Sequence, residues 1–175
     1  ATASATGIDA GNGCDAVVNA GTITADADAA LLSASADLQA VGVGLADFSG
    51  TAGATATGID GGNGSDDILN SGTIAATADA DAQVYGFSFS MVDLTPAAEA
   101  LGFENDGSTN AVASAAGLSG GLSRDEIDNT GSVTATAEAT ALAIGVGLGS
   151  EGLPDFSLDI ANLEDLEDLV DVSVS

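Results

Sequence analysis

The sequence predicts an all-β chain, a parallel β-solenoid of the β-helix or β-roll kind with short helical insertions. One glycine-rich phrase occurs three times in the 175 residues, beginning at Gly7, Gly58 and Gly117. After each copy, apolar and polar residues alternate as in a strand with one buried face. Hydrophobic residues make up 45% of the chain but aromatic residues only 3%, so small side chains must fill a thin core. Such repeats bury their apolar faces by stacking.

The repeats predict a single domain, residues 1–175, that divides at about 1–53, 54–113 and 114–175. The glycine-rich phrase recurs after 51 residues and then after 59. A repeat of this length fits either one wide coil or two coils of about 25 residues each. We favour one wide coil, because the glycine-rich turns then lie directly over one another.

The strand after each turn is expected to bury one face. Asparagine, glycine, isoleucine or valine, and alanine alternate there with threonine and acidic residues. A register slip of one residue would bury Asp26 and Asp28, so the register is strongly specified. The inward positions are Val17, Asn19, Gly21, Ile23, Ala25, Ala27 and Ala29; Ile68, Asn70, Gly72, Ile74, Ala76, Ala78 and Ala80; and Ile127, Asn129, Gly131, Val133, Ala135, Ala137 and Ala139.

The remainder of each repeat predicts further short elements. Alternation that includes glycine indicates a strand whose backbone can be approached closely by a neighbour. Second strands are expected at 41–45, 85–89 and 144–148, a short strand at 54–57, and a brief turn at 47–53.

Two insertions, residues 95–110 and 149–170, are expected to lengthen the second and third repeats. A threonine–proline pair opens the first insertion and is typical of a helix start, so residues 95–101 are expected to be helical. In the second insertion, apolar residues recur every three positions over 160–169 among acids. This spacing predicts an amphipathic helix, with an irregular acidic loop as the alternative. Residues 171–175 alternate again and predict a final strand.

Charge and composition exclude several classes of function. The chain carries 27 acidic residues and one basic residue, Arg124, for a net charge of −26. Such a surface repels nucleic acid and anionic membranes; it fits adaptation to high salt, binding of divalent ions, or a solvated acidic coat. No apolar stretch approaches the roughly 20 residues of a membrane span, so no membrane insertion is expected. With no histidine, no lysine and the single cysteine Cys14, the chain is not expected to be an enzyme.

Residues 61–69 match, position by position, the nonapeptide GGxGxDxUx, in which U is a large apolar residue. This segment resembles the calcium-binding repeats of RTX proteins, which are secreted bacterial toxins, proteases and adhesins that coil into a parallel β-roll. The resemblance implies Ca²⁺ held between successive turns by glycine carbonyls and aspartate carboxylates. The chain departs from the family in having one nonapeptide per repeat, and in Ala10 and Ser123, which replace glycines. The matching positions are Gly61, Gly62, Gly64 and Asp66, then Gly11, Gly13 and Asp15, and Gly120, Gly121 and Asp125.

The aspartates of the turn predict either a cation site or a metal-free corner. In wide coils, Asp15, Asp66 and Asp125 would lie about 4.8 Å apart, the separation of neighbouring strands. Carboxylates at that distance repel by about 1 kcal/mol in bulk water and roughly 3 to 4 at an effective dielectric of 20, which favours a bound cation. Oxygen ligands in a flexible arrangement suit Ca²⁺. In the alternative, glycine supplies a positive φ and aspartate bonds to the backbone.

The phrase Asn-x-Gly-x-Ile after each turn, with valine as its last residue in the third copy, resembles repeats of bacterial autotransporter and haemagglutinin-like β-helices. Inward asparagines stacked on one another can form a ladder, each side-chain amide bonding the next and so satisfying buried polar atoms. The ladder is expected from Asn19, Asn70 and Asn129.

These features predict an extracellular or cell-surface structural protein, such as a stalk, a biofilm or adhesin segment, or a filament subunit. The chain begins without methionine in a strand-like pattern, so we expect a processed product or a piece of a longer protein. Neither end carries an evident polar cap. Open strand edges favour head-to-tail association, with identical subunits or with the rest of a longer chain.

Two other functions stay open. An adhesin module would present the insertions at 95–110 and 149–170 to a carbohydrate or protein partner. An ice-binding protein would use a regular array of hydroxyls, and outward Thr-x-Thr pairs occur here, although Ala75 interrupts the array in the second copy. These pairs are Thr22 with Thr24, Thr55 with Thr57 and Thr134 with Thr136.

Overall fold

The computed structural model describes residues 1–39, 46–92, 105–151 and 156–160, and within these ranges it contains strands and no helix. Three hydrogen-bonded sheets account for the fold; each repeat contributes one strand to each sheet, and the last strand of the third repeat adds a fourth strand to one of them. Neighbouring strands run parallel except for the last strand, which pairs antiparallel. The strands are β1 (Thr2–Asp9), β2 (Ala16–Asn19), β3 (Thr22–Gln39), β4 (Ala46–Asp60), β5 (Asp67–Asn70), β6 (Thr73–Val92), β7 (Asn105–Ser119), β8 (Glu126–Asn129), β9 (Ser132–Glu151) and β10 (Phe156–Ile160).

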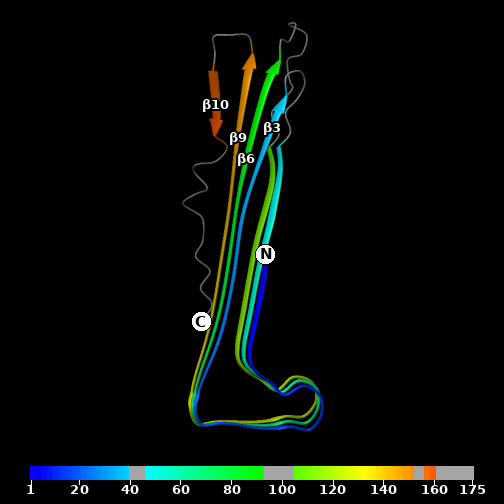
Figure 1. Ribbon diagram of the computed structural model, residues 1–175, viewed down its shortest axis with the longest axis vertical. Helices are drawn as coiled ribbons and strands as arrows, with labels where there is room; N and C mark the ends of the chain where they lie inside the picture. The colour runs from blue at the N-terminus through cyan, green and yellow to red at the C-terminus, as the bar shows by residue number, and fades with distance from the viewer. Residues whose placement is uncertain (40–45, 93–104, 152–155, 161–175) are drawn as a thin grey trace.

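The sheets form a tall shaft that stands on a foot (Figure 1). In each repeat the chain descends the shaft in β1, β4 or β7, crosses the foot in β2, β5 or β8, and ascends the shaft in β3, β6 or β9. A corner of residues 10–15, 61–66 or 120–125 joins the descending strand to the foot. The three repeats follow the same path, so their ribbons nearly superimpose in Figure 1.

The pairing register shows that each repeat is one wide coil. Thr22 of β3 lies opposite Thr73 of β6, and Thr73 lies opposite Ser132 of β9. The same shifts of 51 and 59 residues hold in the other two sheets, where Ile8 pairs with Ile59 and Ile68 with Ile127. The prediction of one wide coil per repeat is therefore confirmed.

The shaft strands are longer than the sequence pattern predicts. Residues 85–89 and 144–148 are in strands, as predicted, but they continue β6 and β9 without a break, so the prediction of separate second strands is wrong. The turn expected at 47–53 is also wrong, because these residues belong to β4. Each expected insertion overlaps strand, since 105–110 lie in β7 and 149–151 in β9.

The structure describes only part of the predicted helical insertions. The helix expected at 95–101 lies outside the described residues, as do 161–169, the second strand at 41–45 and the final strand at 171–175. The second predicted helix is wrong at its start, because Ile160 ends β10. Residues 156–160 alternate with period two, and they pair with the open edge of β9 opposite Val146–Ser150. In the described ranges, no helix long and apolar enough for a membrane crossing is present.

Alanine forms the core of the shaft. Ala54 and Ala56 of β4 pack in one cluster with Ala76, Ala78 and Ala80 of β6, and each of these is at most 2% exposed. Side chains of one methyl group suit two facing sheets that lie closer than the usual separation of about 10 Å. The thin core predicted from composition is confirmed by this cluster.

The foot has a separate core of larger side chains. Ile59, Ile68 and Ile74 of the middle repeat are 0% exposed, which confirms the predicted inward face. Their equivalents Ile127 and Val133 in the third repeat are 44% and 36% exposed, because no described strand lies beyond that repeat at the foot. Burial of the same position thus depends on a neighbour on each side of the repeat.

Candidate functional site at the glycine-rich corner

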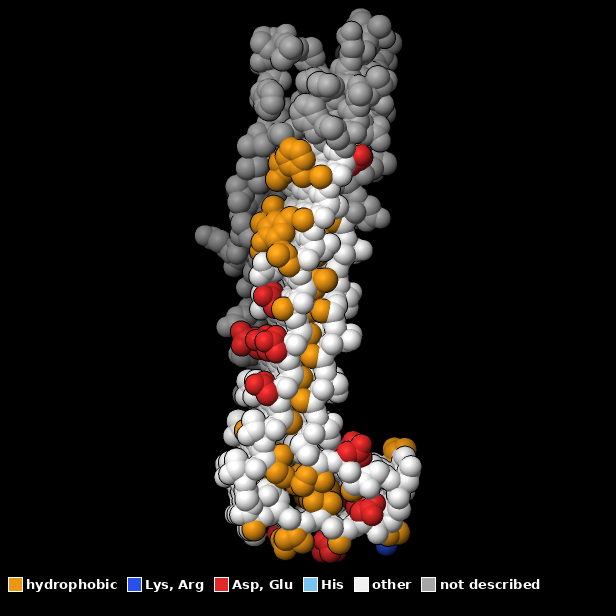
Figure 2. Space-filling view, viewed as in Figure 1, with side chains coloured by type: hydrophobic (Ala, Val, Ile, Leu, Met, Phe, Trp, Pro, Cys, Tyr) orange, Lys and Arg blue, Asp and Glu red, His pale blue; other side chains and the backbone are white. Residues whose placement is uncertain are grey.

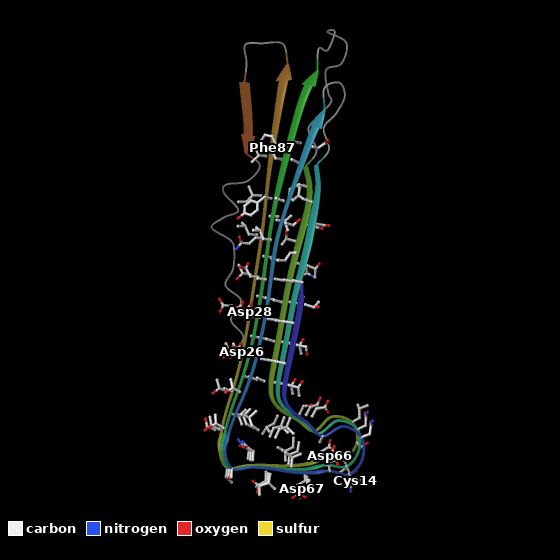
Figure 3. The ribbon with its side chains drawn as sticks, in the orientation of Figure 1. Cys14, Asp26, Asp28, Asp66, Asp67 and Phe87 are labelled. Carbon is white, nitrogen blue, oxygen red and sulfur yellow. The ribbon has the colours of Figure 1, made fainter. Side chains whose placement is uncertain are left out.

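The three corners stack directly on one another. Asn12 bridges to Asn63, and Asn63 to Leu122, in parallel register. The backbone N–H of Gly13 donates to the carbonyl of Asn63 at 2.8 Å, and that of Gly64 donates to the carbonyl of Leu122 at 3.1 Å. Figure 3 shows Cys14 and Asp66 at this corner. The corner is therefore a continuous ladder of backbone hydrogen bonds.

Glycine is required at this corner by backbone conformation and by close approach. Gly62 and Gly64 have φ angles of 84° and 143°, and a Cβ atom on Gly64 would lie 1.3 Å from the carbonyl oxygen of Gly13. Ser123 occupies the equivalent position in the third repeat and keeps a left-handed φ of 110°. The substitution therefore leaves the sense of the turn unchanged but places a side chain in a conformation that L-residues rarely adopt.

The predicted aspartate column is present. Asp66 Oδ1 accepts the backbone N–H of Asp15 at 2.9 Å, and Asp125 Oδ1 accepts that of Asp66 at 3.1 Å. Asp66 is only 3% exposed. The Oδ2 atoms of Asp15 and Asp66 are buried and accept no hydrogen bond from the described residues. Asp66 thus has one oxygen bound to the backbone and one buried oxygen without a partner among the described residues, and Asp15 also has a buried oxygen of the second kind.

The corner fits a cation only in part. A buried carboxylate oxygen without a donor is costly and favours a positive ligand. The Oδ2 atom of Asp66 points toward Gly61, since a Cβ on that residue would lie 2.9 Å from it and 2.8 Å from the carbonyl oxygen of Gly120. However, no three histidine, cysteine or acidic side chains converge anywhere in the described ranges. Ca²⁺ takes six to eight oxygen ligands, so carbonyl oxygens or water would have to supply most of them.

The predicted asparagine ladder is confirmed. Asn19 Nδ2 donates to Asn70 Oδ1 at 2.7 Å, and Asn70 Nδ2 donates to Asn129 Oδ1 at 2.7 Å. Each Oδ1 also accepts the backbone N–H of the glycine two residues later, as in Asn19 with Gly21 at 3.0 Å. The ladder therefore has a direction, with its donors all toward the third repeat.

The alternation places the acidic residues of the ascending strands on the outer face, but it does not predict a second asparagine pair or the stacking of those acids in one column. Asn63 Nδ2 donates to Asn12 Oδ1 at 2.8 Å on the outside of the corner. The two residues occupy the same position in the glycine-rich phrase, and this equivalence could have predicted the pair. On the ascending sheet, Asp28, Asp79 and Glu138 lie side by side in register. Like charges directly opposite one another destabilise a sheet.

An apolar patch lies above this acidic column on the outer face of the shaft (Figure 2). It includes Leu32, Tyr85 and Phe87, whose side chains are 73%, 36% and 42% exposed. Because Ala34 pairs with Tyr85 and Ala36 with Phe87, the patch crosses from β3 to β6. The outer face is thus acidic toward the foot and apolar toward the top.

A groove of about 500 Å³ opens at the third repeat, where no coil among the described residues covers the shaft core. It runs between β7 and β9 and is lined mostly by alanine. The lining residues are Ala111, Val112, Ala113, Ser114, Ala115, Ala135, Ala137 and Ala139.

Comparison of the chain with protein-family models, with curated proteins and with solved structures found no match.

Proposed function

We propose that the chain is a parallel β-solenoid that serves as a structural segment, a stalk or filament subunit, of an extracellular or cell-surface protein. The observation that carries this proposal is the in-register stacking of three coils, in which the strand edges of the first repeat and most of those of the third pair with no described strand. Open parallel edges with an exposed apolar interior favour the addition of another coil. Head-to-tail addition does not close on itself and therefore produces a fibre.

Electron microscopy and sedimentation velocity of the purified chain test this proposal. Fibres of uniform width, or a concentration-dependent series of oligomers, are expected. A monodisperse monomer at every concentration would contradict self-association. That result would favour a different role for the open ends.

Calcium at the glycine-rich corner is a second part of the proposal. Its support is the pair of buried Oδ2 atoms on Asp15 and Asp66, which a cation between neighbouring corners would satisfy. We expect CaCl₂ added after EDTA treatment to raise the melting temperature measured by circular dichroism, and MgCl₂ to raise it less.

The variant Asp66→Asn sharpens the calcium test. Asparagine keeps an oxygen that can accept the Asp15 backbone N–H, but it removes the charge and offers a donor in place of Oδ2. The variant should lose the response to calcium while remaining folded. Asp67→Asn is a matched control, because Asp67 is exposed and adjacent in sequence. If wild-type melting is the same in excess EDTA and in calcium, structural calcium is excluded.

A second candidate function is an adhesin module, and the exposed aromatic side chains of Tyr85 and Phe87 favour it. Exposed aromatic rings beside acidic groups are suited to a carbohydrate or protein partner. Tyr85→Ser combined with Phe87→Ser should abolish such binding in a glycan or cell-surface binding assay. Self-association should be unchanged, because these side chains lie on the exposed face of β6 and not at a strand edge.

A further inference from the structure

The two ends of the stack expose different hydrogen-bonding groups. At the third repeat, Asn129 Nδ2 and the backbone N–H of Asp125 donate to no described residue, although the same groups of the middle repeat donate to the third. At the first repeat, Asn19 Oδ1 accepts the N–H of Gly21 alone, and Asp15 Oδ2 is buried without a donor in the described ranges. In the asparagine ladder and the aspartate column, unused donors are therefore found at the third repeat and unused acceptors at the first, whereas the outer pair of Asn63 and Asn12 runs in the opposite direction.

This polarity determines which ends can meet. If two third repeats met, the unused donors of these two columns would face donors, and if two first repeats met, their unused acceptors would face acceptors. Both arrangements leave polar groups of the ladder unpaired, which costs free energy when they are buried. Only a third repeat against a first repeat pairs the unused donors of the asparagine ladder and the aspartate column with acceptors.

The apolar interior repeats with the same register. Ala3 and Ala5 of β1 lie opposite Ala54 and Ala56 of β4, which in turn lie opposite Ala113 and Ala115 of β7. In the ascending sheet, the columns are Ala25, Ala76 and Ala135; Ala27, Ala78 and Ala137; and Ala29, Ala80 and Ala139. The last alanine of each column lines the groove of the third repeat. The first repeat therefore carries alanines at the spacing that the groove requires.

We propose that this groove binds the first repeat of a second copy of the chain in the same register, with Thr2 of the second copy opposite Val112 and Thr22 opposite Ser132. This inference rests on the proposed function and specifies its interface. β10 already pairs with β9 at Val146–Ser150. The second copy pairs with β9 from Ser132 to Gly145, and with β7 and β8 along the foot and the lower shaft.

The proposed register brings Cys14 of the second copy opposite Arg124. Within one chain, Cys14 and Ser65 occupy the same corner position in neighbouring repeats, as do Ser65 and Arg124, and all three are exposed. Neighbouring coils are about 4.8 Å apart, within the Cα separation that a disulfide spans. Cys14 and residue 124 of one chain are two coils apart, about 9.6 Å, which is too far for a disulfide.

The variant Arg124→Cys therefore tests the register directly. After oxidation in about 1 M NaCl, where the Debye length is about 3 Å and charge repulsion is screened, it should form a ladder of covalent multimers on non-reducing gels. Reductant should dissolve the ladder. Ser65→Cys is the matched control, because its new thiol lies one coil from Cys14 and should form an intramolecular disulfide without multimers. Arg124→Cys combined with Cys14→Ser should form no ladder.

Three results would overturn the register. They are fibres of Arg124→Cys without cross-links, a ladder that persists in the Cys14→Ser double variant, and dimers through Cys14 alone in the wild type. The first of these leaves the proposed function standing. A wild-type chain that stays monomeric overturns both the register and the filament.

Asn129→Asp provides an independent measurement. Aspartate keeps the oxygen that accepts the Asn70 side chain and the Gly131 N–H, but it removes the unused donor and faces Asn19 Oδ1 of the second copy with another acceptor. The critical concentration for association, measured by sedimentation, should rise at least about tenfold with no loss of monomer melting temperature. An unchanged critical concentration would remove the asparagine ladder from the interface.

Discussion

At the scale of single residues, glycine has two separate roles in this chain. At Gly62 and Gly64 it permits a left-handed backbone and lets the next coil approach. At Gly86 and Gly107 the backbone is extended, and glycine makes room for the ring of Phe48, which a Cβ on either residue would approach to 2.0 Å. The same residue type therefore marks a turn in one place and the interior of a strand in another.

Ser123 carries backbone strain that glycine would relieve. A non-glycine residue in the left-handed region costs of order 1–3 kcal/mol, and part of the gain from glycine is offset by its greater freedom in the unfolded chain. Ser123→Gly should therefore raise the free energy of unfolding by about 1 kcal/mol, measured by chemical denaturation.

Gly64→Ala is the opposite change at the equivalent position. It should lower the free energy of unfolding by about 3 kcal/mol or more, because strain is added to a clash with the Gly13 carbonyl. If Ser123→Gly and the wild type have the same free energy of unfolding, Ser123 carries no backbone strain at the third corner.

At the scale of elements, a strand is predicted well where apolar and polar residues alternate without interruption. It is predicted poorly where glycine interrupts the alternation. The alternation from Asn70 to Ala80 predicts each buried position, because a strand has only two faces. The glycines in residues 47–53 and 85–89 suggest breaks. The strands continue there because the core is thin: a Cβ on Gly50 would lie 2.6 Å from both Leu31 and Val84.

The sequence predicts that the three corners stack on one another, but it does not predict how their hydrogen bonds are arranged. The repeat places the aspartates in one column, and the hydrogen bonds confirm it. The direction of those bonds, from one coil to the aspartate of the next, follows from three-dimensional geometry that the repeat length does not contain. The antiparallel β10 was missed because apolar spacing within 160–169 favours a helix.

Phe48 and Gly86 should behave as a coupled pair. Phe48 is the large side chain of a small cluster with Val84 and is 5% exposed. Phe48→Ala should cost about 3–4 kcal/mol in unfolding free energy, and Gly86→Ala should also destabilise through its clash with the ring.

The double variant Phe48→Ala, Gly86→Ala should lose less than the sum of the single losses, because the added methyl group then occupies space left by the ring. A chemical denaturation cycle of the four proteins measures this coupling. Additive losses would contradict direct packing of the two residues.

At the scale of the whole molecule, charge opposes a fold that stacking stabilises. A net charge of −26 on 175 residues generates repulsion that one basic residue cannot offset. Part of it is concentrated where Asp28, Asp79 and Glu138 lie in register.

Salt should therefore raise the melting temperature of this protein in EDTA, because the Debye length falls from about 10 Å at 0.1 M to about 3 Å at 1 M. Asp79→Asn should stabilise the chain at low salt by up to about 1 kcal/mol and should have little effect at high salt. Melting curves by circular dichroism at both salt concentrations measure this difference. A stabilisation that is independent of salt would assign the effect to another cause.

The direction of stacking has a mechanical consequence. In Figure 1 the three repeats superimpose along the line of sight, which is the shortest axis of the molecule, while the shaft stands along the longest. Each added repeat extends the assembly by only about 4.8 Å along that line. An assembly of many repeats would therefore be a tall, flat stack of coils with the foot projecting along its base. Tension along the stacking direction would load every backbone hydrogen bond between neighbouring coils at once.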